Sequence, residues 1–209
     1  MATNTVKPPI KETVGAQYMC FNTMDENGEW TTEFETDVEK SKTVKTVKVK
    51  ENSEENNQYA SGEIYDTDTS ITSSEIEVEV IAFSDITMCK MRGDNVDEGG
   101  LILSGGKRPR PFFAYGKVVK LKGDKVRLDW YPKCKLITNS DEASTSEDKA
   151  KEQTDTVTIK AYPFNSAGDI ASKVASDVNW PEGLTEEKYF SKVILDQAGL
   201  TSVITVTAQ

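Results

Sequence analysis

Two sets of residues with oxygen-bearing side chains, spaced two apart, have the types needed for acid–base catalysis or for binding a metal ion. Asp66 and Asp68 resemble a pair of catalytic carboxylates, but their threonine-rich surroundings predict a solvated strand edge instead of a desolvated active site. Asp25, Asn27 and Glu29 alternate like calcium ligands, yet no glycine or distal glutamate falls where an EF-hand loop requires it. We therefore expect a hairpin turn at the second set and no metal site.

The glycine-rich stretch from Gly100 to Lys107 comes near a phosphate-binding loop. It has Arg108 where a serine or threonine would hold the metal, and it runs into prolines where a helix must begin. We therefore expect a flexible linker there. The adjoining basic cluster of Lys107, Arg108 and Arg110 suits either nucleic-acid contact or a salt bridge between subunits, and the acidic composition favours the salt bridge.

The composition narrows the classes of function. The 209 residues include no histidine, which removes the commonest general base and the commonest zinc ligand. A formal net charge of -10 argues against a protein that grips nucleic acid by its phosphates. We expect no enzyme activity, no cofactor and no metal.

The compartment is predicted from the cysteines and the apolar runs. Cys20, Cys89 and Cys134 are scattered, which predicts reduced thiols. The beginning of the sequence has no apolar stretch typical of a signal peptide, and no run is long enough for a membrane span. These features predict a soluble protein made in the cytosol, without a membrane partner.

The stretch from Arg110 to Thr138 is predicted to be the central β-hairpin. Its side chains alternate with a period of two on both arms, and Gly123-Asp124 offers a tight turn between them. Five of the seventeen aromatic residues lie in this stretch, so we expect it to form the core.

Further strands are predicted at 17–21, 30–38, 42–50, 58–65, 75–83 and 154–163, with a bulge near Val44. Residues 51–57 and 139–153 are expected to be loops, and 66–74 either an exposed strand or an ordered arm. Short helices are expected from Ser84 or Asp85 to Met91, ending at Gly93, and from Thr185 to about Leu195, followed by a β-prone tail.

The sum is a mainly β fold, a β-sandwich or partial barrel of seven to eight strands with one packed α-helix. We divide the chain into an extended arm (1–15), the β-domain (16–195) and a C-terminal extension (196–209).

The strand at 75–83 places Glu75, Glu77 and Glu79 on one face, opposite Ile76, Val78 and Val80. Three carboxylates on one strand face are either ordinary solvated surface or a functional feature. Lysines of a neighbouring strand (Lys45, Lys48 and Lys50) are expected to neutralise part of this charge.

The succession of these segments resembles the major tail proteins, the tail-tube subunits of long-tailed siphophages of Gram-positive bacteria. The resemblance covers about residues 15–195. It is carried by NQYASGEIYDTDTS, SSEIEVEVIAF, SDITMCKMRG, the aromatic hairpin, the loop NSDEASTSEDKAKEQ, the strand TDTVTIKAYPF and EEKYFSKV.

The resemblance implies a structural virion protein of the phage tail, made in the infected cell, that assembles into six-fold rings stacked as a tube. Genomic DNA would pass through the lumen without specific binding, and a tape measure and a terminator protein would be further partners. Glu75, Glu77 and Glu79 become candidates for the lumen lining, where carboxylates repel phosphates. Candidates for contacts between subunits or rings are Tyr59, Tyr65, Asp66, Asp68, Lys107, Arg108 and Arg110.

Two other classes remain open. An immunoglobulin-like binding or adhesion module, carried on a virion, would also be a β-sandwich, and a carboxylate enzyme would need a pocket with perturbed acids. Self-association distinguishes them, because only a tube subunit should polymerise with itself.

Overall fold

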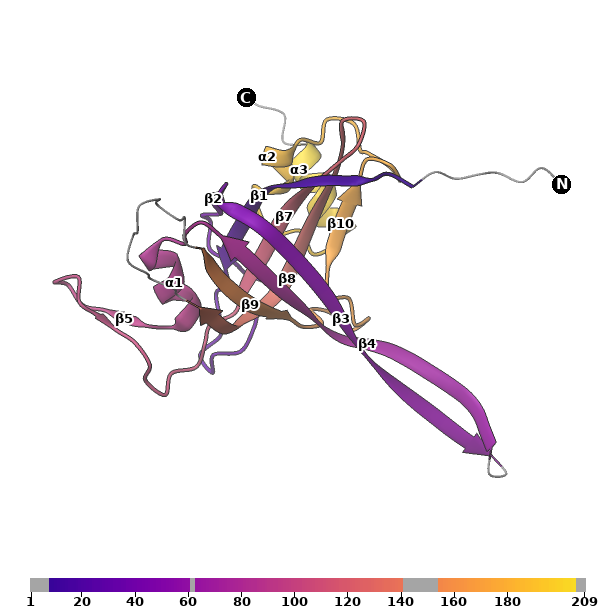
Figure 1. Cartoon of the computed structure of the whole chain (residues 1–209), viewed down its shortest axis with the longest axis horizontal. Helices are drawn as coiled ribbons and strands as arrows, with labels where there is room; N and C mark the ends of the chain where they lie inside the picture. The colour runs from indigo at the N-terminus through magenta and orange to yellow at the C-terminus, as the bar shows by residue number, and fades with distance from the viewer. Residues whose placement is uncertain (1–7, 61–62, 141–153, 206–209) are drawn as a thin grey trace, which may run out of the picture.

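The fold is mainly β and is built on one antiparallel sheet of eight strands (Figure 1). The computed structural model describes residues 8–60, 63–140 and 154–205. The sheet has the order β2-β1-β7-β8-β9-β4-β3, and β10 also pairs with β8. The strands are β1 (Lys11–Phe21), β2 (Glu39–Ser41), β3 (Val44–Ala60), β4 (Glu63–Val80), β7 (Phe113–Leu121), β8 (Lys125–Ser140), β9 (Asp155–Ala161) and β10 (Ser172–Ala175).

The predicted central hairpin is confirmed as β7 and β8. Every residue of β7 from Phe113 to Val119 is buried, because one face of this strand lies in each of two cores. Leu121 pairs with Lys125, so the turn has three residues and not two, and both Gly123 and Asp124 have positive φ.

The first core lies inside the curved sheet. It draws side chains from β1, β4, β7, β8 and β9, and valines of β3 pack against it from the sheet's far end. Strand β3 ends the strand order and β1 is next to its other end, yet the two lie close together, as a sandwich or partial barrel requires. The buried members include Met19, Ile76, Val78, Phe113, Tyr115, Tyr131, Leu136, Val157 and Ile159.

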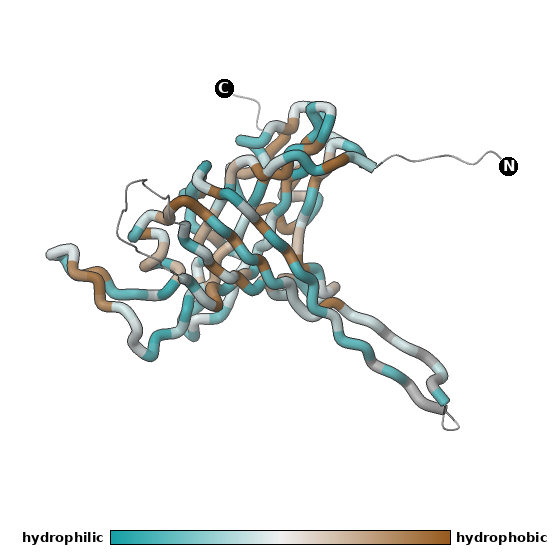
Figure 2. Tube along the Cα trace, viewed as in Figure 1, coloured by the Kyte–Doolittle hydropathy of each residue, from teal (hydrophilic) through white to brown (hydrophobic). Residues whose placement is uncertain are grey.

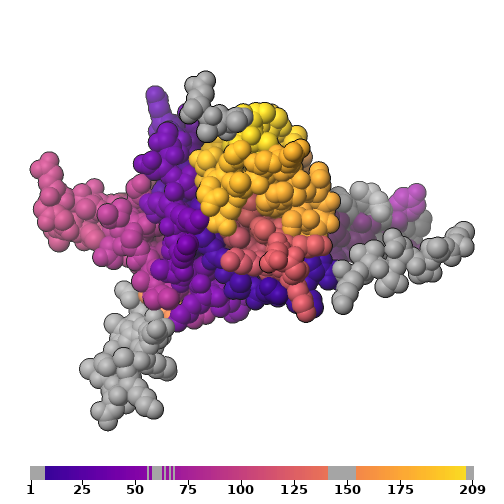
Figure 3. Space-filling view, turned by 90° about the horizontal axis from the view of Figure 1, so that it is seen from above, coloured from indigo at the N-terminus to yellow at the C-terminus, as the bar shows by residue number. Residues whose placement is uncertain are grey.

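The second core lies on the outer face of β1, β7 and β8. Two short helices, α2 (Glu186–Tyr189) and α3 (Gln197–Thr205), cover it. Figure 3 shows this C-terminal segment, in orange and yellow, as one block over the indigo N-terminal strand. Phe190 lies in the middle of it, stacked on Tyr18 and edge-on to Trp130.

The predicted caps of the first helix are confirmed. Helix α1 spans Asp85–Arg92; the side chain of Ser84 accepts a hydrogen bond from the Thr87 amide, and Gly93 ends the helix in the left-handed conformation. The chain then forms a small hairpin of β5 (Asn95–Val96) and β6 (Ile102–Leu103), which projects from the body.

Several sequence predictions are wrong. Residues 51–57, expected to be a loop, continue β3, because they pair across to β4 along their whole length. Residues 30–38 form no strand and make only an isolated bridge between Asn22 and Phe34. The helix that begins after Thr185 ends at Tyr189, and the tail expected to be β-prone forms α3. The structure thus has three helices in the described residues, where the sequence predicted two, one of which was to pack on the sheet.

Other sequence predictions agree with the structure only in part. Strand β1 begins at Lys11 and not at Gln17, and β10 was not predicted. The bulge expected near Val44 is confirmed by a register shift between Val44 and Thr46. All three cysteines are free and buried. Residues 141–153, the core of the predicted charged loop, lie outside the described part of the chain.

Candidate functional site

The outer face of β4 carries the glutamates that the sequence singled out. Glu75 and Glu77 are exposed and Glu79 is half-buried, while Ile76, Val78 and Val80 on the opposite face are 0% exposed. The predicted alternation is therefore confirmed. What it places outward is one row of a three-stranded surface formed by β3, β4 and β9.

Lysines on both neighbouring strands flank these carboxylates. Glu75 lies between Lys50 of β3 and Lys160 of β9, and Glu77 is paired with Lys48. Antiparallel partners share a face, so their charges meet across the ladder.

The pair between Lys48 and Glu77 is direct, with Nζ and Oε1 2.6 Å apart, and this hydrogen bond raises the pKa of Lys48. The expected neutralisation is confirmed for Lys48, and Lys50 is placed beside Glu75 by backbone register. Lys45 lies beside the bulge and lines a different pocket. The three-stranded surface is thus close to charge balance.

Strands β3 and β4 extend well beyond the body as a paired hairpin, which we call the arm (residues 53–60 and 63–71; Figure 1). Tyr65 is 80% exposed, and the described glutamates Glu54, Glu55 and Glu63 are exposed as well. Figure 2 shows almost no strongly hydrophobic colour along the arm. Residues 66–74 form a strand, as one of the two predicted alternatives has it; Thr67 and residues 69–71 are exposed, whereas Ser73 and Ser74 are buried.

The remaining candidates on the arm are placed by backbone register alone. Tyr59 pairs with Ile64, Asp66 with Gln58 and Asp68 with Asn56, which puts all three near the outer end of the hairpin. Their side chains are outside the part of the chain that the structure describes.

The basic cluster does not act as one group. Arg108 donates a hydrogen bond to the carbonyl of Leu103 at 2.6 Å, and Arg110 donates to the carbonyl of Leu136 at 2.7 Å. These two side chains therefore fasten the β5–β6 hairpin and the start of β7. Lys107 is exposed in the bend between β6 and β7.

The two other motifs agree with their predicted structures only in part. The stretch expected to be a flexible linker contains strand β6, which pairs with β5, and the next element is strand β7 and not a helix. Asp25 lies in a turn, where its Oδ1 accepts hydrogen bonds from the amides of Asn27 and Glu29. Within the described ranges, no three acidic, cysteine or histidine residues are placed to hold a metal ion.

A buried ionic cluster lies between β7 and β8, and the sequence analysis missed it. Arg127 donates from Nε and Nη2 to the Asp129 carboxylate at 2.9 and 3.1 Å. Lys117, the register partner of Asp129, approaches the same carboxylate to 3.7 Å. Asp129 is 0% exposed and Lys117 is 5% exposed. The predicted two-residue turn would have set Trp130 opposite Lys117, and only the observed three-residue turn brings Asp129 there.

Burial lowers the pKa of Lys117 to about 8. Arg127, Lys173 and Lys11 lower it further, and Asp129 opposes them. Two cations thus share one buried carboxylate, which leaves an excess of positive charge at this point.

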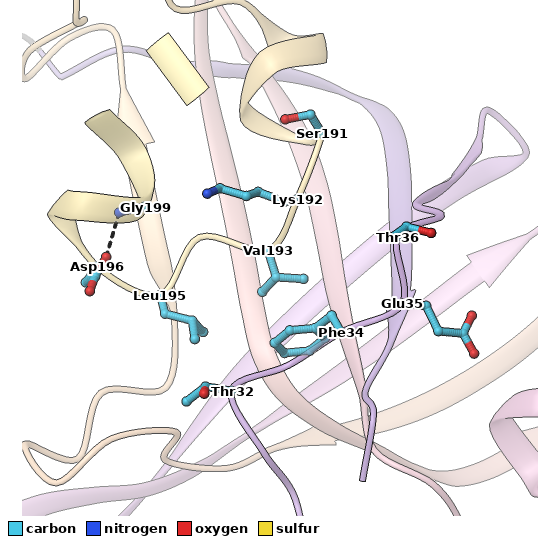
Figure 4. A pocket seen from close by; sticks show the side chains of 10 residues that line it. All are labelled: Thr32, Phe34, Glu35, Thr36, Ser191, Lys192, Val193, Leu195, Asp196 and Gly199. Carbon is cyan, nitrogen blue, oxygen red and sulfur yellow. Dashed lines mark hydrogen bonds between the residues drawn. The ribbon is translucent and has the colours of Figure 1, made fainter. Parts of the chain in front are cut away.

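An open cleft lies between the 32–36 segment and the chain after α2 (Figure 4). Its volume is about 490 Å³. Phe34, Val193 and Leu195 supply its apolar side chains, and Glu35, Lys192 and Asp196 supply its charges. Asp196 accepts a hydrogen bond from the Gly199 amide at 2.7 Å. The cleft presents no pair of groups arranged for acid–base chemistry.

Neither a scan against protein-family models nor a search of the curated proteins finds a match to this chain. In the described residues, no helix has the length and apolar character needed to cross a membrane. The function is therefore argued from the geometry of the arm and of the charged surfaces.

Proposed function

We propose that this chain is a tail-tube subunit of a long-tailed phage. It assembles with copies of itself into hexameric rings, and the rings stack into a tube through which DNA leaves the virion. In this role it needs no catalytic group and no cofactor. Its partners are further copies, a tape measure and a terminator protein.

The arm is the single observation that carries the proposal. A two-stranded hairpin is marginally stable in water unless it packs on something, because it buries little apolar surface of its own. The arm of this chain is long and regularly paired, yet its described side chains are mostly exposed. Contact with neighbouring copies would give the arm the packing that the single chain does not provide.

The β5–β6 hairpin supports self-association independently. Val96 is 54% exposed and Leu101 is 59% exposed, and Ile102 and Leu103 beside them are exposed as well. Figure 2 shows this apolar stretch on the part of the hairpin that projects from the body. An apolar hairpin that stands out from a protein body is typical of an interaction surface.

The outer surface of β3, β4 and β9, which we call the conduit face, is the proposed lumen lining. Its glutamates and lysines alternate between strands, so passing DNA would meet no row of unpaired cations that could hold its phosphates. The chain's net charge of -10 adds a weak long-range repulsion. DNA would thus pass over a surface to which it does not adhere. This surface is less acidic than the sequence of β4 alone predicts.

Shortening the arm tests the proposal. Glu54 pairs with Ser70, so residues 55–69 can be replaced by Asn-Gly, which closes the same two strands with a tight turn. Sedimentation velocity from dilute to concentrated protein should show large assemblies for the unmodified chain and only monomers for the shortened one. The thermal unfolding midpoint of both should agree, because the arm contributes little to the two cores. Equal assembly of the two proteins would contradict the proposal.

The second candidate is a binding module that uses the cleft of Figure 4. The observation that favours it is the partly buried apolar lining of this cleft, which includes Phe34 and Leu195. Such a module stays monomeric at every concentration until it meets its ligand, and the same sedimentation series distinguishes it.

A further inference from the structure

A second pocket, of about 300 Å³, is lined by residues of β1, β3, β7 and β8. Four of its ten lining residues are cationic and one, Glu12, is acidic. Lys117 and Arg127 form its inner wall, and the exposed residues Lys11 and Lys45 stand at its rim. This concentration of positive charge contrasts with a chain whose net charge is -10.

The inner wall has an incompletely compensated ammonium. Asp129 is engaged by both nitrogens of the Arg127 fork, and its Oδ2 lies 3.7 Å from Lys117 Nζ, which is too far for a hydrogen bond. Lys117 is nearly buried and lines the pocket, and such an ammonium is stabilised by an anion that enters beside it. The pocket volume suits one or two carboxylate side chains, and the rim lysines attract them.

The arm is the acidic element of this chain. It contains Glu54, Glu55, Glu63, Asp66 and Asp68 and has no lysine or arginine. The glutamates among them that the structure describes are exposed. Their charge is therefore complementary to that of the pocket.

A chain cannot place its own arm in its own pocket. Strand β3 supplies the pocket residues Lys45 to Val47 and then continues into the arm. At the rise of an extended strand, Val47 and Glu55 are about 25 Å apart, and the pairing with β4 keeps the strand extended. Figure 1 shows the arm pointing away from the crossing of β1 and β3.

We propose that the pocket lined by Lys11, Lys45, Lys117 and Arg127 receives carboxylates from the acidic arm of a second copy of this chain. The contact is heterologous, because the arm and the pocket are different surfaces. It therefore propagates from copy to copy and does not close as a two-fold dimer. This inference rests on the proposed self-assembly and assigns one of its contacts.

Charge reversal on exposed residues tests the contact without disturbing either core. Glu54→Lys with Glu55→Lys, or Lys11→Glu with Lys45→Glu, should each raise the concentration for half-assembly by about tenfold or more. All four changes in one chain restore opposite charges and should bring assembly back toward the original concentration. Glu26→Lys with Glu182→Lys, two exposed glutamates outside the arm, is the control with the same change in net charge and should have little effect.

A cross-linking measurement gives a second readout that does not depend on charge. A chain with Glu55→Cys and Lys11→Cys, treated with a short bis-maleimide, should give a ladder of linked copies on a denaturing gel. The native cysteines are buried and unreactive in the folded chain. Glu55→Cys with Val178→Cys, whose second position is exposed elsewhere, should not give the ladder.

The outcomes separate this inference from the proposed function. If the chain assembles and neither reversal nor cross-linking has an effect specific to the arm and pocket, the contact is wrong while the tube proposal stands. If no assembly occurs at any concentration, the proposed function and the contact are both wrong. Three results together would support the contact. Both charge-reversal variants should lose assembly, the combined variant should regain it, and the cross-linked ladder should form only with the cysteine pair in the arm and the pocket.

Discussion

The rings of Tyr18 and Phe190 stack face to face, with their centroids 3.8 Å apart and their planes 5° apart. Tyr18 belongs to β1, and its hydroxyl donates a hydrogen bond to Glu186 at 2.5 Å, while Lys40 donates to the same oxygen at 2.9 Å. Burial, followed by the bond to Glu186, raises the pKa of Tyr18 to about 12. The stack thus fastens the C-terminal segment to the N-terminal strand.

Truncating Phe190 should loosen the C-terminal segment. Phe190→Ala removes the stack on Tyr18 and the edge contact with Trp130, and we expect the free energy of unfolding to fall by about 3–5 kcal/mol. Phe190→Leu keeps most of the volume and should cost about 1–2 kcal/mol. Urea denaturation measures both. If both variants lost the same small amount of unfolding free energy, the Phe190 ring would not be central to the packing of the second core.

Gly116 has no room for a side chain. An added Cβ would lie 2.7 Å from the ring of Phe190 and 2.9 Å from the ring of Trp130. We expect Gly116→Ala to destabilise the fold by about 1–3 kcal/mol through overpacking. Gly99→Ala is the matched control, since nothing lies within 4 Å of its Cβ position, and its thermal midpoint should stay unchanged. A Gly116→Ala protein as stable as the control would show that the packing can relax.

The buried Lys117 predicts a pH dependence. Its pKa is lowered to about 8 in the folded chain and returns to about 10.5 on unfolding. Below pH 8 both states are charged and the native state bears the full cost of burial. Between pH 8 and 10.5 the native lysine loses its proton while the unfolded one keeps it, so this cost disappears.

The stability of the unmodified chain relative to Lys117→Met should therefore rise through this pH window, by at most about 3 kcal/mol. Urea denaturation of both proteins between pH 7 and 10, at concentrations where the chain is monomeric, measures the difference. The comparison cancels the pH dependence that comes from the buried cysteines and tyrosines, because the two proteins share these residues. A difference that does not change with pH would contradict the burial of a charged lysine at this position.

The conduit face predicts an effect on DNA. Changing Glu75, Glu77 and Glu79 to lysine would place like charges beside Lys48, Lys50 and Lys160 and create a strongly cationic surface. Assemblies of this variant should retain DNA in a salt-dependent way, whereas those of the unmodified chain should not. The triple glutamine variant keeps the shape with less added charge and should fall between them. DNA retention and ejection identical to the unmodified protein would remove this face from the lumen.

The elements that were predicted from sequence have local signals. The alternation of β4 and β9, the Ser84 and Gly93 caps and the glycine turn of the β7–β8 hairpin each depend on residues close together in the chain. The outer half of β3 has no apolar alternation, so it was expected to be a loop. It is extended because β4 pairs with it, and that partner is not visible in a local window.

The C-terminal segment shows the same limit. Val203, Ile204 and Thr205 favour strands by propensity, yet they end helix α3, because Leu200 and Val203 bury on one side of it. The glutamates of the candidate site were found from their alternation alone. The compensating Lys160 and the Lys117–Asp129 pairing depend on which strands become neighbours, and the register of a sheet is not written in any single strand.

Negative-stain electron microscopy of the purified protein, dilute and then concentrated, tests the central claim most directly. A tail-tube subunit should give rings or hollow tubes of uniform width whose abundance rises with concentration. Small particles of monomer size at every concentration would contradict self-assembly and favour the binding module instead.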